Sequence, residues 1–229
     1  MTNNNEYVYK VVEHFISING EGKRAGQLAL FIRFAGCNLN CEYCDTTWAN
    51  EKDVKYESFT QDELVDIILK SKVKNVTLTG GEPLIQEGVG CLFKRLRKLT
   101  DIRIEIETNG SVDIKPYIKN EPDNVSFTLD YKTGASGMES RMYLYNYRNV
   151  RSCDTVKFVV GSRNDLEQTG IIIKKYNLIE KGCGIYISPC FGRIQPEEIV
   201  EYLVENRLND VNVQLQLHKY IWAPDKRGV

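Results

Sequence analysis

The sequence has no surplus of positive charge, because its 30 lysine and arginine residues are offset by 31 aspartate and glutamate residues. A protein that grips nucleic acid through phosphates usually carries a basic excess, so we expect no nucleic-acid partner. No apolar run approaches the roughly 20 residues that a membrane-spanning helix needs. The polar start, Met1 to Glu6, lacks the apolar core of a signal peptide. We therefore expect a cytoplasmic protein with no membrane attachment.

A second cysteine pair is also missing. Of seven cysteines, three fall together in Cys37-Asn-Leu-Asn-Cys41-Glu-Tyr-Cys44. An odd, clustered set does not suit a disulfide scaffold, whereas thiolates are soft ligands for zinc and iron–sulfur clusters. A structural zinc site needs four ligands, and three leave one coordination site open, as a catalytic cluster requires. A zinc site completed by Cys190 or a histidine remains the alternative. The four scattered cysteines are predicted to be small core residues: Cys91, Cys153, Cys183 and Cys190.

Strand-like and helix-like stretches alternate along the chain. The predicted strands are Phe15–Ile18, Leu28–Phe34, Val76–Thr79, Ile102–Glu107, Val125–Leu129, Thr155–Val160, Gly184–Ile187 and Val211–Leu217, and the predicted helices are Thr60–Ser71, Cys91–Leu99, Asp165–Tyr176 and Pro196–Asn206. Such alternation implies an α/β fold with a mostly parallel sheet. About six units are too few for a complete (β/α) barrel. We therefore predict a partial (β/α) barrel of about six parallel strands in a single domain, residues 1–229.

Polar, glycine-containing or proline-containing motifs end four of these strands. They are Gly80-Gly-Glu-Pro83, Thr108-Asn-Gly110, Asp130-Tyr-Lys132 and Ser188-Pro189. Ligands bind at the carboxyl ends of parallel strands, so one face could collect all four motifs, although each alone would pass for a turn. The segment Gly20-Glu-Gly22-Lys-Arg-Ala25 fits the loose dinucleotide fingerprint. That fingerprint must open a helix, and a strand-like run follows instead, so we reject a nucleotide site there.

The cysteine spacing Cys-x₃-Cys-x₂-Cys, with Tyr43 before the last cysteine, resembles the radical S-adenosylmethionine superfamily. The motif Gly80-Gly-Glu-Pro83 resembles the second signature of that superfamily. The resemblance implies a 4Fe–4S cluster held by Cys37, Cys41 and Cys44, whose remaining iron chelates S-adenosylmethionine. It also implies that Gly80, Gly81 and Glu82 meet the methionine amino group, because small residues permit close approach and a carboxylate suits an ammonium.

A narrower resemblance is to the 7-carboxy-7-deazaguanine synthase family. The segments that carry it are Ser17–Gly22, Phe31–Cys37, Cys44-Asp-Thr46, Glu107–Gly110, Asp130–Lys132, Ser136-Gly137, Val156–Val159 and Gln216–Lys219. This implies an enzyme of queuosine and 7-deazapurine biosynthesis. Its pterin substrate, 6-carboxy-5,6,7,8-tetrahydropterin, loses a hydrogen from carbon 6 to a 5′-deoxyadenosyl radical, and the ring contracts with loss of ammonia. The resemblance further implies assistance by Mg²⁺, an electron donor such as flavodoxin or ferredoxin, and a homodimer.

The resemblance also implies roles for individual residues. Those expected at the S-adenosylmethionine site are Tyr43, Asp45, Gly110, Asp130, Tyr131, Lys132, Ser188, Pro189, Cys190 and Phe191; those expected at the substrate are Ile18, Asn19, Gly20, Glu21, Arg33, Thr108 and His218. Arg33 would pair with the substrate carboxylate through its guanidinium fork, and Thr46 would offer a hydroxyl to Mg²⁺. Considered as residues alone, Arg33 could instead be half of a structural ion pair, Thr46 a turn cap and His218 a structural histidine.

Two departures and two alternatives accompany this interpretation. The segment Thr133-Gly-Ala135 lacks the proline and serine expected before Ser136, and the tail to Val229 is longer than in members whose terminal carboxylate meets the substrate. A radical-generating activase of a glycyl-radical enzyme or anaerobic ribonucleotide reductase would share the cluster motif. An iron–sulfur or zinc binding module is the non-enzymatic alternative. The segments Ser17–Gly22 and Cys44-Asp-Thr46 favour the small-molecule enzyme.

Overall fold

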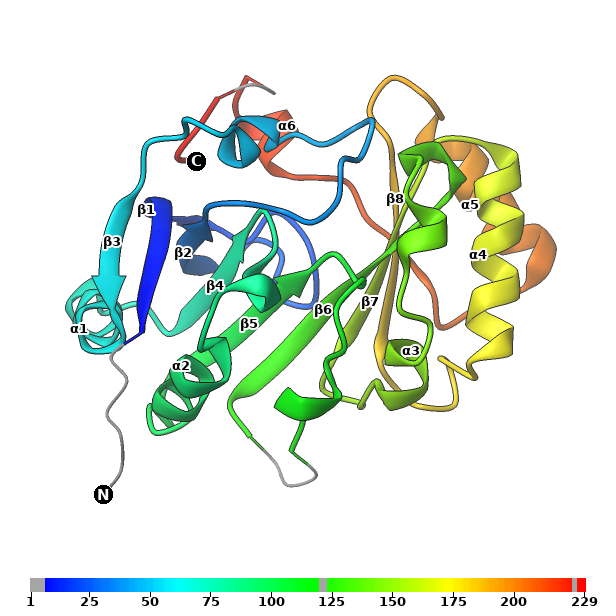
Figure 1. Cartoon of the computed structure of the whole chain (residues 1–229). Helices are drawn as coiled ribbons and strands as arrows, with labels where there is room; N and C mark the ends of the chain where they lie inside the picture. The colour runs from blue at the N-terminus through cyan, green and yellow to red at the C-terminus, as the bar shows by residue number, and fades with distance from the viewer. Residues whose placement is uncertain (1–6, 120–122, 224–225) are drawn as a thin grey trace.

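The described strands of the protein, seen here as a computed structural model, form one curved sheet (Figure 1). The structure describes residues 7–119, 123–223 and 226–229. In sheet order the strands are β3 (Glu57–Thr60), β1 (Val8–Ile18), β2 (Leu28–Phe34), β4 (Asn75–Gly80), β5 (Arg103–Thr108), β6 (Val125–Lys132), β7 (Thr155–Val160), β8 (Gly184–Pro189) and β9 (Asn212–Val213). Strand β1 is antiparallel to β2 and β3, whereas every pairing from β2 to β9 is parallel. The predicted α/β fold with a mostly parallel sheet is confirmed. Strand β1 extends the predicted strand Phe15–Ile18 toward the N-terminus, and β3 is an addition.

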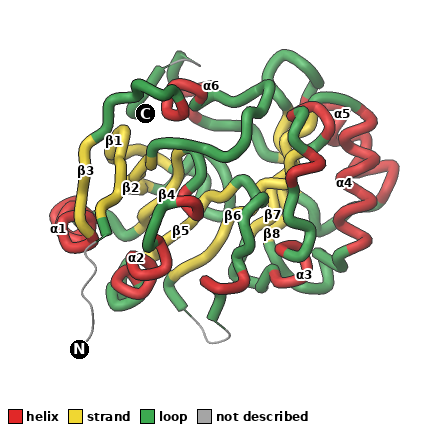
Figure 2. The backbone as a smooth tube through the Cα atoms, viewed as in Figure 1, coloured by secondary structure: helices red, strands yellow, loops and turns green. Residues whose placement is uncertain are grey.

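The helices differ in position: the longer ones accompany the parallel strands on the outer side of this sheet, whereas the short last one lies near the C-terminus (Figures 1 and 2). They are α1 (Gln61–Ser71), α2 (Val89–Leu96), α3 (Asn146–Asn149), α4 (Arg163–Lys175), α5 (Pro196–Asn206) and α6 (His218–Ile221). The predicted start at Thr60 is confirmed, because the Thr60 hydroxyl accepts from the Glu63 N–H and the Glu63 carboxylate accepts from the Thr60 N–H. Helix α2 starts earlier than predicted, directly after Gly88, whose φ of 70° is left-handed. None of the described helices is long and apolar enough to span a membrane.

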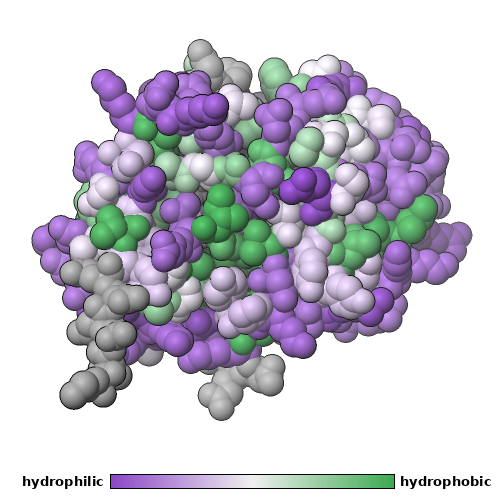
Figure 3. Space-filling model, viewed as in Figure 1, coloured by the Kyte–Doolittle hydropathy of each residue, from purple (hydrophilic) through white to green (hydrophobic). Residues whose placement is uncertain are grey.

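Alternation along the strands separates an apolar layer from a polar one. On β7, Val156 and Phe158 are fully buried, whereas Lys157 and Val159 line a cavity on the inner side of the sheet. On β5, Ile106 is buried and Glu107 lines the same cavity. The sequence showed this alternation, but its polar side faces the hollow of the partial barrel rather than bulk solvent. The outer surface in Figure 3 is largely hydrophilic, with hydrophobic residues in small groups.

The open edge of the barrel is bridged by the chain after β9. The strand predicted over Val211–Leu217 is wrong beyond Val213. The Gln214 N–H still donates to the Ile187 carbonyl of β8 at 2.9 Å, but the chain then bonds to a distant loop. The Gln214 side chain accepts from the Gly22 N–H at 2.7 Å and donates to the Gly22 carbonyl at 3.2 Å. The Leu217 N–H donates to the Gly20 carbonyl at 3.2 Å. The loop between β1 and β2 is thereby held against the far end of the sheet.

Candidate active site

A cavity of about 770 Å³ lies on the inner side of the sheet, where the parallel strands end. It brings together most of the residues predicted for the site. Those in its wall are Ile18, Gly20, Glu21, Arg33, Cys37, Cys41, Tyr43, Cys44, Asp45, Thr46, Gly80, Gly81, Thr108, Asp130, Lys132, Cys190, Phe191 and His218. Those outside its wall are Asn19, Glu82, Gly110, Tyr131, Ser188 and Pro189.

The three clustered cysteines lie in the loop after β2 as free, half-buried thiols. This loop is anchored at both ends, because the Gly36 N–H donates to the Ala49 carbonyl at 3.0 Å and the Glu42 N–H to the Ser136 carbonyl at 3.1 Å. No three histidine, cysteine, aspartate or glutamate side chains in the described ranges are grouped as a single metal ion would require. A 4Fe–4S cluster places each cysteine on a different iron, so its ligands stand apart. The donor set, three soft thiols at a cavity wall, therefore fits a cluster better than a lone ion.

The other cysteines divide between burial and exposure. Cys183 and Cys190 are buried and Cys91 is half-buried, in keeping with the predicted core role. Cys153 is exposed, so the prediction is wrong there. It follows β6 and α3 in a turn beside Asp154, where the chain runs over the surface before β7 begins.

The glycine pair after β4 supports the cysteine loop. A side chain at Gly81 would place its Cβ 1.9 Å from the Gly36 carbonyl oxygen, and one at Gly80 would come within 2.3 Å of the Phe34 carbonyl oxygen. Backbone bonds fix this contact, with the Gly81 N–H donating to the Phe34 carbonyl at 3.1 Å. Only glycine permits so close an approach, and the approach sets the cysteine loop at the cavity wall.

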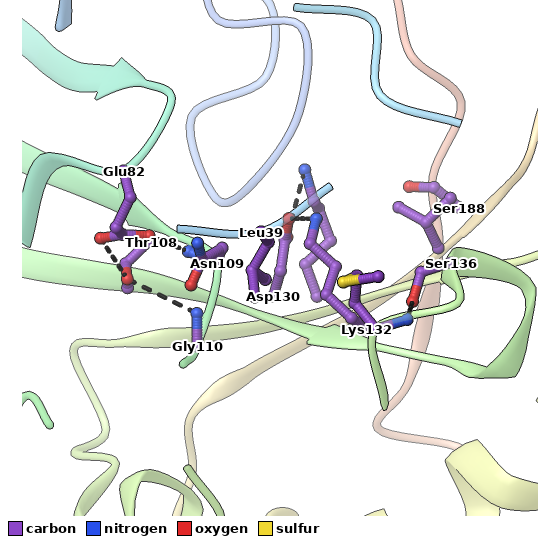
Figure 4. A network of polar contacts seen from close by, with 12 residues as sticks. Leu39, Glu82, Thr108, Asn109, Gly110, Asp130, Lys132, Ser136 and Ser188 are labelled. Atoms are coloured by element: carbon purple, nitrogen blue, oxygen red, sulfur yellow. Dashed lines mark hydrogen bonds and ion pairs between the residues drawn. The ribbon is translucent and has the colours of Figure 1, made fainter. Parts of the chain in front are cut away.

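Glu82 lies behind the cavity wall, not in it as expected. Its fully buried carboxylate accepts hydrogen bonds from the Thr108 hydroxyl at 2.8 Å and the Asn109 N–H at 2.7 Å (Figure 4). It also accepts from the Leu84 N–H at 2.9 Å. Burial raises the pKa of Glu82 to about 7 against these three donors. The carboxylate joins the loop after β4 to the end of β5.

Two further predicted cofactor residues are packing residues for reasons of backbone geometry. Tyr131 follows Asp130 on β6, so alternation turns its ring outward, 5.4 Å from the Tyr147 ring centroid. Gly110 has a left-handed φ of 79°, and a Cβ there would lie 2.3 Å from the Asp130 carbonyl oxygen. It therefore allows the loop after β5 to pass close to β6.

Ser188 and Asn19 also lie behind the wall, where they hold its residues in place. The buried Ser188 hydroxyl donates to the Glu21 carboxylate at 3.0 Å. The Asn19 side-chain oxygen accepts from the Thr77 hydroxyl at 2.9 Å. Pro189 faces a separate, smaller cavity of about 120 Å³.

A row of alternating charges runs across the cavity floor. The Lys157 ammonium lies 3.1 Å from the Glu21 carboxylate and 3.5 Å from that of Asp130, which also pairs with Lys132 (Figure 4). Burial alone would lower the pKa of Lys157, but these carboxylates outweigh it and hold the pKa well above its ordinary value. Burial would likewise raise the pKa of Asp130, and the two ammonium groups hold it below the ordinary value. All four groups are therefore charged at neutral pH.

Lys157 and Glu107 also line the cavity, although they were not predicted as site residues from the sequence. Burial raises the pKa of Glu107 to about 7, partly offset by the nearby Lys157 ammonium. The signal was present, since each is a charged residue that alternates with apolar ones along its strand. Such a residue faces the hollow of a curved sheet, because its neighbours face the helices.

Arg33 forms a structural ion pair and also lines the cavity. Its Nε donates to the Glu13 carboxylate at 2.8 Å, and its Nη1 lies 3.5 Å from the Thr46 hydroxyl. The Thr46 hydroxyl itself donates to the Asp45 carboxylate at 2.8 Å. The structural ion pair therefore exists, but it occupies the Nε edge, and the rest of the guanidinium faces the cavity beside Thr46.

The C-terminal part of the chain completes the cavity mouth. The His218 ring packs on Gly20, where a Cβ would lie 2.4 Å from its Nδ1. Burial lowers the pKa of His218. Residues Lys226–Val229 contribute to the cavity wall, and the Arg227 guanidinium lies 4.2 Å from the Trp48 ring centroid. No role for this tail could be predicted, because a stacking contact with a residue so distant along the chain leaves no local pattern in the sequence.

Comparisons with known proteins decide the family. The sequence model of the Radical SAM superfamily matches residues 31–131. The chain is 55% identical to the 7-carboxy-7-deazaguanine synthase of Clostridium acetobutylicum, over 96% of this chain and 99% of that protein. The chain belongs to the 7-carboxy-7-deazaguanine synthase family. Identity to the synthase of Chlorobaculum tepidum is 36%, over 96% of each chain.

Solved structures of low sequence identity share the fold. The crystal structure of QueE from Escherichia coli superposes with a TM-score of 0.73 at 22% identity, covering 91% of this chain and 94% of that one. The structure of Streptococcus suis SuiB bound to S-adenosylmethionine gives a TM-score of 0.54 at 15% identity, covering 81% and 48%. As a radical S-adenosylmethionine enzyme of the synthase family, the chain uses a 4Fe–4S cluster, S-adenosylmethionine and Mg²⁺. The relatives favour neither the activase nor the binding-module alternative.

Proposed function

We propose that this chain converts 6-carboxy-5,6,7,8-tetrahydropterin into 7-carboxy-7-deazaguanine with release of ammonia, as a single catalytic domain. The observation that carries the proposal is that one cavity holds the cysteine loop on one side and a charged, polar strand face on the other. A radical cofactor needs the first, and a pterin with a carboxylate and several ring N–H groups needs the second. The relatives named as synthases support the same reaction.

In this proposal Cys37, Cys41 and Cys44 hold the cluster, with one iron left for S-adenosylmethionine. Bound together, the cluster and S-adenosylmethionine supply the carbon radical that removes hydrogen from carbon 6 of the substrate. The protein orients the two reactants and excludes water from the space between them. Among the side chains in the cavity wall, we assign those of Tyr43, Asp45, Asp130, Lys132, Cys190 and Phe191 to the S-adenosylmethionine side.

Arg33 is assigned to the substrate carboxylate. Because Glu13 occupies its Nε, the two terminal nitrogens present the fork that a carboxylate accepts. Thr46, 3.5 Å from the Arg33 Nη1, is assigned to Mg²⁺ together with substrate oxygens and water. A neutral hydroxyl is a weak ligand, so the ion should bind well only with substrate present.

The pterin ring is assigned to the opposite wall, at Ile18, Gly20, Glu21 and Thr108. Lys157, Ser188 and Gln216 all bond to the Glu21 carboxylate, at 3.1, 3.0 and 3.2 Å, so its direction is fixed before any ligand arrives. Glu107, with a pKa of about 7, can hold a proton at neutral pH. Ammonia leaves only after the departing nitrogen is protonated, and a group with such a pKa suits that transfer.

The proposal is tested by anaerobic turnover of the reconstituted protein with the carboxytetrahydropterin, S-adenosylmethionine, Mg²⁺ and dithionite. Mass analysis should show consumption of the pterin and a product that has lost ammonia. The Cys37→Ala variant is the matched control, and it should give no product. Cleavage of S-adenosylmethionine without any consumption of pterin would contradict the proposed substrate.

We further propose a homodimer and reduction by a flavodoxin or ferredoxin. Apolar side chains exposed at the β1–β2 ribbon support the dimer, since Ile16 is 50% and Leu28 61% exposed. Light scattering should give twice the chain mass, and Leu28→Glu should shift it toward the single chain. A monomer for the unaltered protein would contradict the dimer. Replacement of dithionite by reduced flavodoxin or ferredoxin should sustain turnover.

A further inference from the structure

The side chain of Asn109 reaches from the end of β5 to the first clustered cysteine. Asn109 is only 7% exposed, and its Nδ2 lies 3.5 Å from the Cys37 Sγ. The Leu39 N–H donates to the same sulfur at 3.4 Å. Asn109 and Leu39 are labelled in Figure 4. Neither Cys41 nor Cys44 receives such a side-chain donor among the described residues. Cys37 is therefore distinguished from the other two thiols by its surroundings.

The orientation of the Asn109 amide is fixed by its other partners. Its Oδ1 accepts from the Ser111 N–H at 2.9 Å and the Ser111 hydroxyl at 2.7 Å. Its Nδ2 donates one hydrogen to the Asn38 Oδ1 at 2.9 Å, and the Asn38 Nδ2 in turn donates to the Ser111 Oγ at 2.8 Å. Turning the amide over would lose both Ser111 bonds and set two oxygens against each other. The second Nδ2 hydrogen is thus left to the sulfur.

The backbone of Asn109 is held just as firmly. Its N–H donates to the buried Glu82 carboxylate at 2.7 Å. The Thr108 hydroxyl donates to the same carboxylate. Glu82 is itself tied through its own N–H to the Gly36 carbonyl at 2.9 Å. The donor and the cysteine loop are therefore braced against one another through Glu82, and the N–H···S contact is part of a built arrangement.

We propose that Asn109 is a positioning residue that donates a hydrogen bond to the Cys37 thiolate and raises the reduction potential of the cluster. This inference rests on the proposed function, in which Cys37 is a cluster ligand. The reduced cluster carries one more negative charge than the oxidised one, so its sulfur accepts hydrogen bonds more strongly. Donors to the sulfurs consequently stabilise the reduced form and are among the factors that set such potentials.

The test is a redox titration of the reconstituted protein, followed by electron paramagnetic resonance in the absence of substrate. Asn109→Ala removes the donor, and we expect about a tenfold shift toward the oxidised cluster, which is about 59 mV downward for one electron. Asn109→Asp keeps the side-chain size but sets a carboxylate oxygen against the sulfur, so its potential should be lower still. Ser111→Ala is the matched control, because the Ser111 N–H still holds the Asn109 amide, and its potential should equal that of the unaltered protein.

The outcomes separate the two proposals. Clusters that load in both Asn109 variants with an unchanged potential would overturn the role of Asn109 and leave the proposed function standing. If Asn109→Ala takes up no cluster, the near-isosteric Asn109→Asp carries the comparison. An unaltered protein that binds no 4Fe–4S cluster would overturn the proposed function and this inference together.

Discussion

The Nε of Arg33 donates to the carboxylate of Glu13 across 2.8 Å, between neighbouring antiparallel strands and at the edge of the cavity. This pair turns the guanidinium so that its terminal nitrogens lie on the side of Thr46. We therefore expect Arg33→Lys to behave as a non-conservative change, since lysine has no fork to divide between Glu13 and a substrate carboxylate. The KM for the pterin should rise at least about tenfold, while cleavage of S-adenosylmethionine without substrate persists. An unchanged KM would reduce Arg33 to a structural ion pair.

Thr46 should make turnover sensitive to magnesium. With Thr46→Ala, stimulation of the metal-stripped enzyme by added Mg²⁺ should be blunted, because one oxygen ligand is lost, and the cluster absorbance should be unchanged. Thr100→Ala, at an exposed position outside the cavity wall, is the control. If Thr46 only caps a turn, its loss should cost about 1 kcal/mol of stability and leave the Mg²⁺ titration as it was.

Lys157 should be essential to the stability of the cavity floor. Lys157→Met would leave the Glu21 and Asp130 carboxylates without their shared cation in a largely buried setting. Removal of one partner of a buried pair typically costs about 3–5 kcal/mol, so urea unfolding of the apoprotein should show a loss of that order. Arg163→Met breaks an exposed pair with Glu205 and should cost far less stability. Similar losses in the two variants would argue against a structural role for Lys157.

Glu107 should make the stability of the apoprotein fall as the pH rises. Burial raises its pKa from 4.5 to about 7, so across that interval the folded protein holds a proton that the unfolded chain has released. The favourable contribution is complete below about pH 4.5 and is lost as the pH rises through about 7. Glu107→Gln should flatten this part of the decline in thermal stability between about pH 5 and pH 8, whereas Glu201→Gln, at an exposed position, should not. Glu82, whose pKa is also raised to about 7, should supply what decline remains.

Much of this fold could be predicted because its local signals agree with its tertiary structure. The helix after Thr60 carries its own cap, the proline-led helix α5 and strand β7 match their predicted bounds, and the parallel order follows from the alternation of elements. The segment after Val213 could not be predicted as irregular, because its apolar alternation is strand-like and it is bonds to the distant residues Gly20 and Gly22 that draw it away from β8.

The site was predictable to the level of motifs, but not of side-chain direction. The cysteine spacing marks the loop, yet it does not say that the glycine pair after β4 contacts this loop or that Glu82 turns inward to Thr108. The motif Asp130-Tyr-Lys132 was interpreted as following its strand, but it forms the end of β6. Had it been included in the strand, the alternation of side chains would have predicted that Tyr131 points outward, as it does. A family resemblance implies roles for residues but does not give the positions of their side chains. Those positions decide which residues can contact a ligand.

The central claim is that one cavity brings carbon 6 of the pterin to the radical cofactor. Its most direct test uses substrate carrying deuterium at carbon 6 in anaerobic turnover of the reconstituted enzyme, with mass analysis of the S-adenosylmethionine pool and the product. We predict that deuterium enters the 5′-deoxyadenosyl carbon of the cofactor while the product forms with loss of ammonia. Product formation with no deuterium transferred to the cofactor, or deuterium-free cleavage of S-adenosylmethionine with the pterin left intact, would contradict the account.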